Sequence, residues 1–271
     1  MIVKAFRLLL CSLLFCGFHG TAVAQSASAS VFLEDLTWTE LKAQIAAGKT
    51  TVLIPIGGTE QSGPYMALGK HNVRARLLAQ RIAERLGNAL VAPVVAYVPE
   101  GAIAPPTAHM RFPGTITVSD EVFEKTLESA ARSFKLHGFR NIVFLGDHGG
   151  YKADLKISAD RLNHEWATGD VKAHAMPEYY SATQNEYLQF LKSRGFAQAE
   201  IGTHAGLADT SLMLALDPSL VRTDALRHAD KPSAEQGEYG DPRRASAQLG
   251  QPGVDFIVEK SVAAIKKATA R

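Results

Sequence analysis

Apolar, β-rich runs alternate with helix-forming segments along most of this chain, and this alternation limits the folds open to it. The runs lie at residues 51–58, 89–98 and 141–146, and a fourth strand is expected at 170–175. Strands separated by helices favour parallel pairing, and continuously apolar strands are typical of a sheet covered on both faces. We therefore predict an α/β fold with a doubly wound, mostly parallel sheet.

The segments between the strands carry helix boundary signals. Thr37 and Glu40 form a capping box before a helix expected at 38–48, and Ser119 caps a helix that closes at Gly138. Further helices are expected at 73–86, 179–194, 209–218 and, after a loop at 237–253, at 254–268.

The first 24 residues have the three-part pattern of a secretory signal peptide. Lys4 and Arg7 precede an almost wholly apolar stretch, and Ala22-Val23-Ala24 forms a cleavage signal. An N-terminal membrane anchor is the alternative, but the stretch is short for a span of about 20 residues. We expect a signal peptide at 1–24, a short tether at 25–33, a single domain at 34–271, and a periplasmic or secreted location.

Composition narrows the possible partners. Both cysteines, Cys11 and Cys16, lie in the signal segment, so the mature chain is expected to lack disulfides and thiolate ligands. Without Lys4 and Arg7, 27 basic residues face 27 acidic ones. This balance favours neither nucleic acid nor an anionic membrane surface as a partner, and we expect no membrane association after signal cleavage.

Ionisable side chains gather in the loops that follow the expected strands, where ligands bind in parallel sheets. They are Glu60 and His71 after the first strand, His109 after the second, Asp147 and His148 after the third, and His204 and Asp209 further on. Gly149 and Gly150 would let the backbone come close to an ion or a substrate. Oxygen and nitrogen ligands without thiolate suit a catalytic Zn²⁺, Mn²⁺ or Fe²⁺ with an open water position.

Each of these residues also has an ordinary interpretation. A single loop histidine is more often hydrogen-bonded than metal-bound, and paired glycines more often serve a turn. The sequence contains no H-E-x-x-H, G-x-S-x-G or P-loop motif.

Five blocks occur in an order that resembles the creatininase (creatinine amidohydrolase) family. They are VLIPIGGTEQSGPYMALGKH, FPGTITVS, HGFRNIVFLGDHGGY, HAGLADTSLML and GEYGDPRRASAQLG, and the resemblance runs from about residue 34 to 265. It implies a three-layer α/β/α sandwich with a mostly parallel central sheet, and a homo-oligomer. It also implies metal-dependent hydrolysis of a non-peptide, often cyclic, C–N amide bond in a small molecule; some relatives act on formamides or trim a modified peptide.

The departures from the family pattern fall on metal-ligand positions. Glu60 is kept, but Ser62 stands where the family has a histidine, and His71 stands where it has an aspartate that bridges two metals. Serine is a poor ligand for a divalent ion, and an imidazole does not readily bridge. We therefore expect one ion per chain rather than two.

The resemblance then implies that Glu60, His71 and His148 hold one divalent ion, zinc being favoured over manganese or iron. Asp209, or less readily Asp147, is a further ligand, a base or a supporting partner. His109 and His204 are candidates for substrate or acid residues; the alternative is that both are hydrogen-bonded loop histidines.

The predicted activity is that of a metal-dependent amidohydrolase, in which the ion activates water and a carboxylate moves the proton. The alternative is a catalytically inactive, family-derived extracytoplasmic ligand-binding protein. The substitutions at Ser62 and His71 are the evidence for that alternative.

Overall fold

The structure, a computed structural model, describes residues 30–270. Four parallel strands form its sheet in the order β2-β1-β3-β4. The strands are β1 (Thr51–Ile56), β2 (Ala89–Val91), β3 (Asn141–Gly146) and β4 (Lys172–Ala175). The helices of eight residues or more are α1 (Trp38–Ala46), α2 (Lys70–Leu86), α3 (Asp120–Leu136), α4 (Lys152–Glu165), α5 (Pro177–Gln184), α6 (Glu186–Ser193), α8 (Leu207–Leu216) and α10 (Ala247–Thr269). Shorter turns of helix are α7 (Gln198–Ile201), α9 (Thr223–Leu226) and the 3-10 helices Leu33–Asp35, Ala108–Arg111, Pro218–Leu220, Ala234–Gln236 and Pro242–Arg244.

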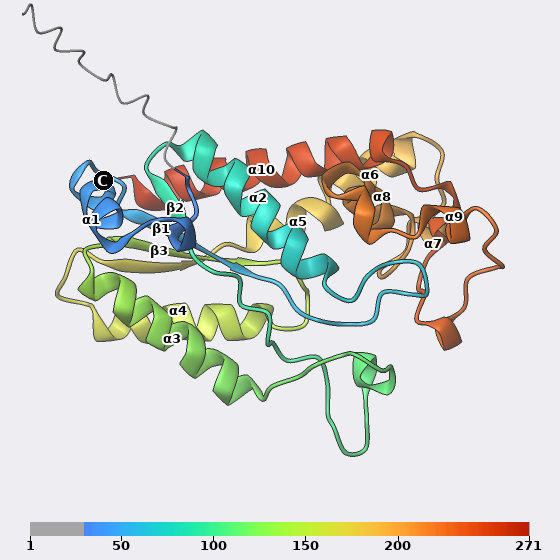
Figure 1. Ribbon diagram of the computed structural model, residues 1–271, viewed down its shortest axis with the longest axis horizontal. Helices are drawn as coiled ribbons and strands as arrows, with labels where there is room; N and C mark the ends of the chain where they lie inside the picture. The colour runs from blue at the N-terminus through green and yellow to red at the C-terminus, as the bar shows by residue number, and fades with distance from the viewer. Residues whose placement is uncertain (1–29, 271) are drawn as a thin grey trace, which may run out of the picture.

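Helices cover both faces of the sheet (Figure 1). Helices α3 and α4 lie on one face, and α2, α5 and α10 lie on the other. Alternate residues of β1 serve the two cores: Val52 and Ile54 pack in the core on the α3 side, and Leu53 packs in the core on the α2 side. The whole of β1 is buried, which is why its sequence is continuously apolar. The predicted three-layer α/β/α sandwich with a parallel central sheet is confirmed.

Several expected elements differ in their bounds. The capping box of Thr37 and Glu40 is present. The second strand ends at Val91 rather than continuing to 98, because Pro93 has no N–H to donate. Only an isolated bridge between Ile56 and Val95 continues the pairing.

The C-terminal third also differs from the sequence prediction. The helix expected at 179–194 is two helices, α5 and α6, which meet at Asn185. The last helix begins at Ala247, not 254, because Ser246 caps it by accepting from Leu249 N. Its glycines allow close packing on α8: a Cβ at Gly250 would lie 1.8 Å from Ser211 O.

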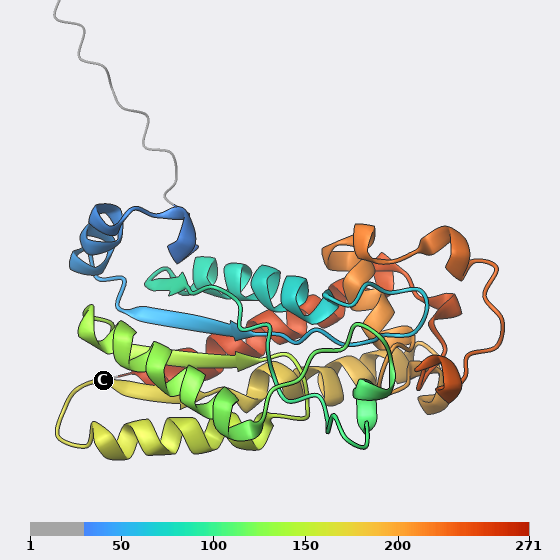
Figure 2. The same ribbon diagram turned by 60° about the horizontal axis from the view of Figure 1, so that its bottom comes forward.

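All four strands point the same way, so the loops at their carboxyl ends gather at one end of the sheet (Figure 2). The segment between β2 and α3 extends away from the body there and carries the 3-10 helix Ala108–Arg111 (Figure 1). In residues 30–270 the non-glycine residues with positive φ are Ala108 (45°) and Ala205 (52°). Both are next to a histidine of this end of the sheet, His109 and His204, which is where backbone strain is expected to collect in a functional site.

The predicted signal peptide (1–24) lies outside the described residues, as does most of the predicted tether (25–33). Phe32 is buried and bridges to Val91, so packing begins before residue 34. None of the helices in residues 30–270 combines the length and apolar character that a bilayer crossing needs.

Candidate functional site

Glu60 lies at the centre of the candidate site, in the loop that follows β1, and its side chain is fully buried. One oxygen, Oε1, is 2.7 Å from His71 Nε2 and 3.6 Å from Lys70 Nζ. The other, Oε2, has no hydrogen-bond partner in the described chain. Burial opposes ionisation, but His71 and Lys70 hold the pKa of Glu60 well below its usual range. Glu60 is therefore ionised and keeps a free oxygen.

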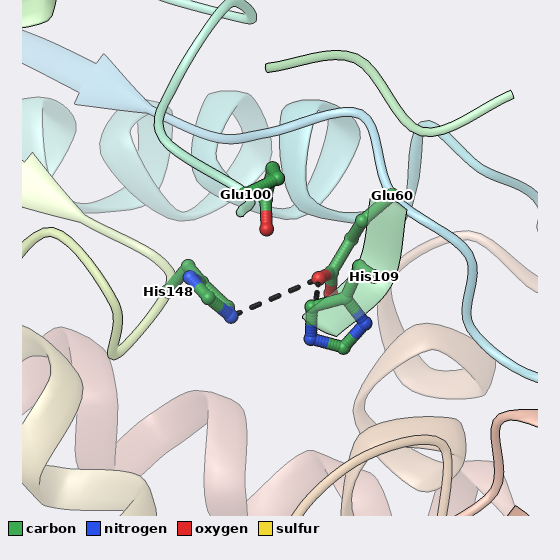
Figure 3. Close-up of side chains that lie close together, drawn as sticks. All are labelled: Glu60, Glu100, His109 and His148. Atoms are coloured by element: carbon green, nitrogen blue, oxygen red, sulfur yellow. Dashed lines mark ion pairs between the residues drawn. The ribbon is translucent and has the colours of Figure 1, made fainter. Parts of the chain in front are cut away.

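His148 and His109 direct a ring nitrogen each at that free oxygen. His148 Nε2 lies 3.7 Å from Glu60 Oε2, and His109 Nε2 lies 3.2 Å from it (Figure 3). Burial lowers the pKa of both histidines, that of His148 to about 4. Both rings are therefore neutral near pH 7, which is the form of histidine that binds metal.

The glycines after His148 make room, as the sequence predicted. A Cβ at Gly149 would lie 2.8 Å from Tyr180 Oη, and one at Gly150 would lie 2.9 Å from the His148 ring. Gly150 N–H donates to His148 Nδ1 at 3.1 Å, which turns Nε2 toward Glu60.

Glu100 completes the cluster and was not identified from the sequence. It is 3% exposed, and neither carboxylate oxygen has a hydrogen-bond partner within residues 30–270. Burial, together with the nearby charge of Glu60, raises the pKa of Glu100 to about 9. One ligand atom from each of Glu60, Glu100, His109 and His148 lies within 4.8 Å of the other three (Figure 3).

His71 does not direct a nitrogen into this cluster. Its Nε2 is 2.7 Å from Glu60 Oε1, and its Nδ1 is 2.5 Å from Asp147 Oδ2. Both ring nitrogens are thus directed at carboxylates, and the ring links Glu60 to Asp147. Asp147 in turn accepts from Arg74 Nε at 2.8 Å and from Tyr179 Oη at 2.9 Å.

Asp209 lies at the start of α8 and lines the cavity, but two buried cations contact it. Lys70 Nζ donates to Oδ2 and Arg74 Nη1 donates to Oδ1, both at 2.8 Å. Burial opposes ionisation here also, yet Lys70 and Arg74 hold the pKa of Asp209 well below its usual range. Lys70 is 0% exposed and Arg74 4%. Asp209 is thus an ionised, fully paired carboxylate.

His204 lies beside this group, behind Glu60. Its Nε2 donates to Gln61 O at 2.9 Å, and its Nδ1 is 3.5 Å from Glu60 Oε1. Burial and the charge of Lys70 lower the pKa of His204 to about 3. The ring is neutral, and its Nε2–H holds the backbone of Gln61 in place.

A cavity of about 380 Å³ opens onto this site, a size typical of small-molecule pockets. His71, His109, His148 and His204 line its inner end together with Asp209. Tyr180, Tyr239 and Arg111 are further wall residues. The structure therefore brings six sequence-predicted residues to one cavity or its floor; they are Glu60, His71, His109, His148, His204 and Asp209.

Three members of the site were missed by sequence reasoning, and two signals could have found them. Glu100 follows the second strand between Pro99 and Gly101, in a loop at the carboxyl end of the sheet. Lys70 and Arg74 stand four residues apart, in line with buried Leu78 and Ile82. Starting α2 at 70 rather than 73 would have placed both cations on its inner face.

Two carboxylates and two imidazoles at the carboxyl end of a parallel sheet, without thiolate, form the kind of cluster that holds a divalent ion in metal-dependent hydrolases. The comparisons agree with this class. The Creatininase (creatinine amidohydrolase) family model matches residues 34–265. The chain belongs to the creatininase family.

Individual relatives are similar over most of their length. Creatinine amidohydrolase of Pseudomonas putida is 31% identical over 227 residues, covering 81% of this chain and 85% of the relative. Mycofactocin precursor peptide peptidase of Mycolicibacterium smegmatis is 28% identical over 221 residues, covering 74% and 78%. A variant creatininase structure described as of the Zn-Zn type is 28% identical, with a TM-score of 0.75, and covers 90% of this chain and 100% of that one.

Proposed function

We propose that this chain is a metal-dependent amidohydrolase that cleaves a C–N bond, other than a peptide bond, in a small molecule. One divalent ion, zinc in preference to manganese or iron, would be held by Glu60, Glu100, His109 and His148. The observation that carries the proposal is the pair of buried carboxylates with unpartnered oxygens facing two neutral imidazoles. A buried carboxyl without a partner is costly to ionise, and a cation between Glu60 and Glu100 offsets that cost.

This ligand set differs from the one the sequence suggested. Glu60 and His148 are common to both. Glu100 and His109 take the places of His71 and Asp209, whose polar atoms already contact Asp147, Glu60, Lys70 and Arg74. We assign His71 and Asp209 supporting roles.

The charge of the site favours one ion over two. Lys70 and Arg74 are basic side chains that contact the carboxylates of Glu60, Asp147 and Asp209. With Glu100 ionised, these four carboxylates are matched by the two side-chain cations and one divalent ion. A second divalent ion would leave the buried site with an excess of positive charge.

A bound ion would supply the polarisation of the amide carbonyl and the activation of water. Asp209 lines the cavity and stays ionised beside Lys70 and Arg74, which fixes the charge at that part of the wall. His204 holds the backbone of Gln61 in place. A neutral histidine that binds an ion through Nε2 carries its hydrogen on Nδ1, so the Gly150 amide has to turn away from His148 when an ion binds.

Ion binding by matched variants tests the proposal. Glu60→Gln and His148→Ala should each lose stoichiometric Zn²⁺ binding in calorimetric titration. His174→Ala is the control, since His174 is a half-buried histidine that contacts Asn141 outside the cluster. Wild-type protein that binds no Zn²⁺, Mn²⁺ or Fe²⁺ would contradict the proposal.

Activity is tested on the ion-loaded chain with cyclic and linear amides, with and without chelator. Chelator-sensitive release of amine would support hydrolysis. Ion binding without hydrolysis of any amide would favour the ligand-binding alternative. The observation behind that alternative is Ser62, whose buried hydroxyl has no hydrogen-bond partner and stands where the family has a metal ligand. Export, a periplasmic or secreted location and a homo-oligomer stay predictions from the sequence.

A further inference from the structure

Arg111 is the unmatched charge of the cavity. Apart from histidines, the ionisable side chains of the described lining residues are Asp209, Arg111 and the two tyrosines. Asp209 is paired with Lys70 and Arg74, whereas no carboxylate of residues 30–270 forms an ion pair with Arg111. A guanidinium is always charged, so the cavity presents one unpaired positive charge to its contents.

The Arg111 side chain is held in place although it is exposed. Its Nε donates to Ala108 O at 3.1 Å, and its Nη2 lies 3.5 Å from Tyr239 Oη. Arg111 belongs to the same 3-10 helix as His109, which directs its ring at Glu60. Ala108 adopts a positive φ of 45° at the start of this helix. One strained segment therefore carries both a proposed metal ligand and the unpaired cation.

The charge of the loaded site also points to an anionic ligand. One divalent ion with Lys70 and Arg74 already matches the four carboxylates of Glu60, Glu100, Asp147 and Asp209, and the histidines around them add no negative charge. Arg111 then remains, and a single negative charge neutralises it. A carboxylate carries one charge, whereas a phosphate monoester carries about two near pH 7.

We infer that the substrate is a small amide that also bears a carboxylate, and that Arg111 binds this carboxylate while the amide lies at the ion. The inference rests on the proposed function and names its substrate class. The rest of the cavity wall carries no net charge and mixes polar side chains, such as Thr183 and Gln184, with apolar ones, such as Leu188.

Two matched probes test this inference without a known substrate. Succinic monohydroxamate carries an ion-binding group and a carboxylate, and its carboxamide analogue carries the same group and no charge. Their dissociation constants are measured by calorimetry on the Zn²⁺-loaded wild-type chain, Arg111→Gln and Arg85→Gln. Arg85 is an exposed arginine near the end of α2 and is the control.

The wild-type chain should bind the carboxylate probe about tenfold more tightly than the carboxamide, as a charge-assisted hydrogen bond implies. Arg111→Gln should abolish this preference, and Arg85→Gln should retain it. The preference should also weaken as salt is added. Zn²⁺ content and the thermal unfolding midpoint should be the same in all three proteins.

Equal binding of the two probes to the wild-type chain would overturn the inference and leave the proposed function standing. A preference that survives in Arg111→Gln would overturn the role of Arg111. Failure of the wild-type chain to bind Zn²⁺ would instead contradict the proposed function, on which the inference depends.

Discussion

The pH dependence of ion binding should report on Glu100. In the ion-free chain, burial and the charge of Glu60 raise the pKa of this carboxyl to about 9, so it is protonated near pH 7. A carboxylate has to lose its proton to bind an ion, so the apparent affinity should rise with pH and level off above about pH 9. His148, with a pKa of about 4, is already neutral and adds no slope in this range.

The size of the effect follows from the distance between the working pH and the pKa. pH 7 lies about two units below the pKa of this carboxyl, so its deprotonation costs about 3 kcal/mol, or roughly a hundredfold in affinity. The dissociation constant for Mn²⁺ should therefore fall about tenfold per pH unit between about pH 6.5 and about pH 8.5. Titrations in buffers of different ionisation enthalpy should show about one proton released per ion.

Two variants make this prediction specific to Glu100. Glu100→Gln should bind Mn²⁺ more weakly at high pH and show no slope. Glu238→Gln should keep the wild-type slope, because Glu238 is a buried carboxyl with a raised pKa that lies outside the cluster. A pH-independent affinity in the wild-type chain, or an unchanged slope in Glu100→Gln, would refute the assignment of Glu100 as a ligand.

Three further predictions concern the buried charges and the packing. Lys70→Met should lower the free energy of unfolding in urea by about 3 to 5 kcal/mol, because it leaves the carboxylates of Asp209 and Glu60 without this cation. Lys260→Met, at an exposed ion pair, should cost less than about 1 kcal/mol. Equal effects would contradict the role of Lys70. Ser62→Ala should leave the Zn²⁺ affinity within about twofold of wild type, since the hydroxyl has no partner, and a large loss would mean that Ser62 is a ligand. Gly250→Ala should lower the free energy of unfolding by about 1 to 3 kcal/mol despite the better helix propensity of alanine, because its Cβ would meet Ser211 O at 1.8 Å. A stabilised variant would show that α8 and α10 pack less closely than this distance implies.

The fold followed from the sequence because its strongest signals are local and repeated. β1 and β3 are apolar along their whole length, and this pattern already implies a sheet covered on both faces. The element ends that differ from the prediction depend on single residues, which give only a weak signal in the sequence. Pro93 shortens the second strand, and Ser246 starts α10 before the proline and glycines that suggested a loop.

The site was predicted in location more than in detail. Strand ends identify which loops converge, so Glu60 and His148 could be brought together from the sequence. The distances between loops could not be predicted from the sequence. The contacts of His71 with Asp147 and of His109 with Glu60 therefore became known only from the structure. Lys70 was missed because a charged residue early in a helix is usually solvated, whereas here it is fully buried between two carboxylates.

The number of ions per chain tests the central claim most directly. Elemental analysis of the chain, purified without chelator and then saturated with Zn²⁺ and freed of excess ion, should give about one ion per chain. The same analysis of Glu60→Gln should give none. Two ions per chain would contradict the argument that Lys70 and Arg74 supply the remaining positive charge, and no ion in the wild-type chain would contradict the account as a whole.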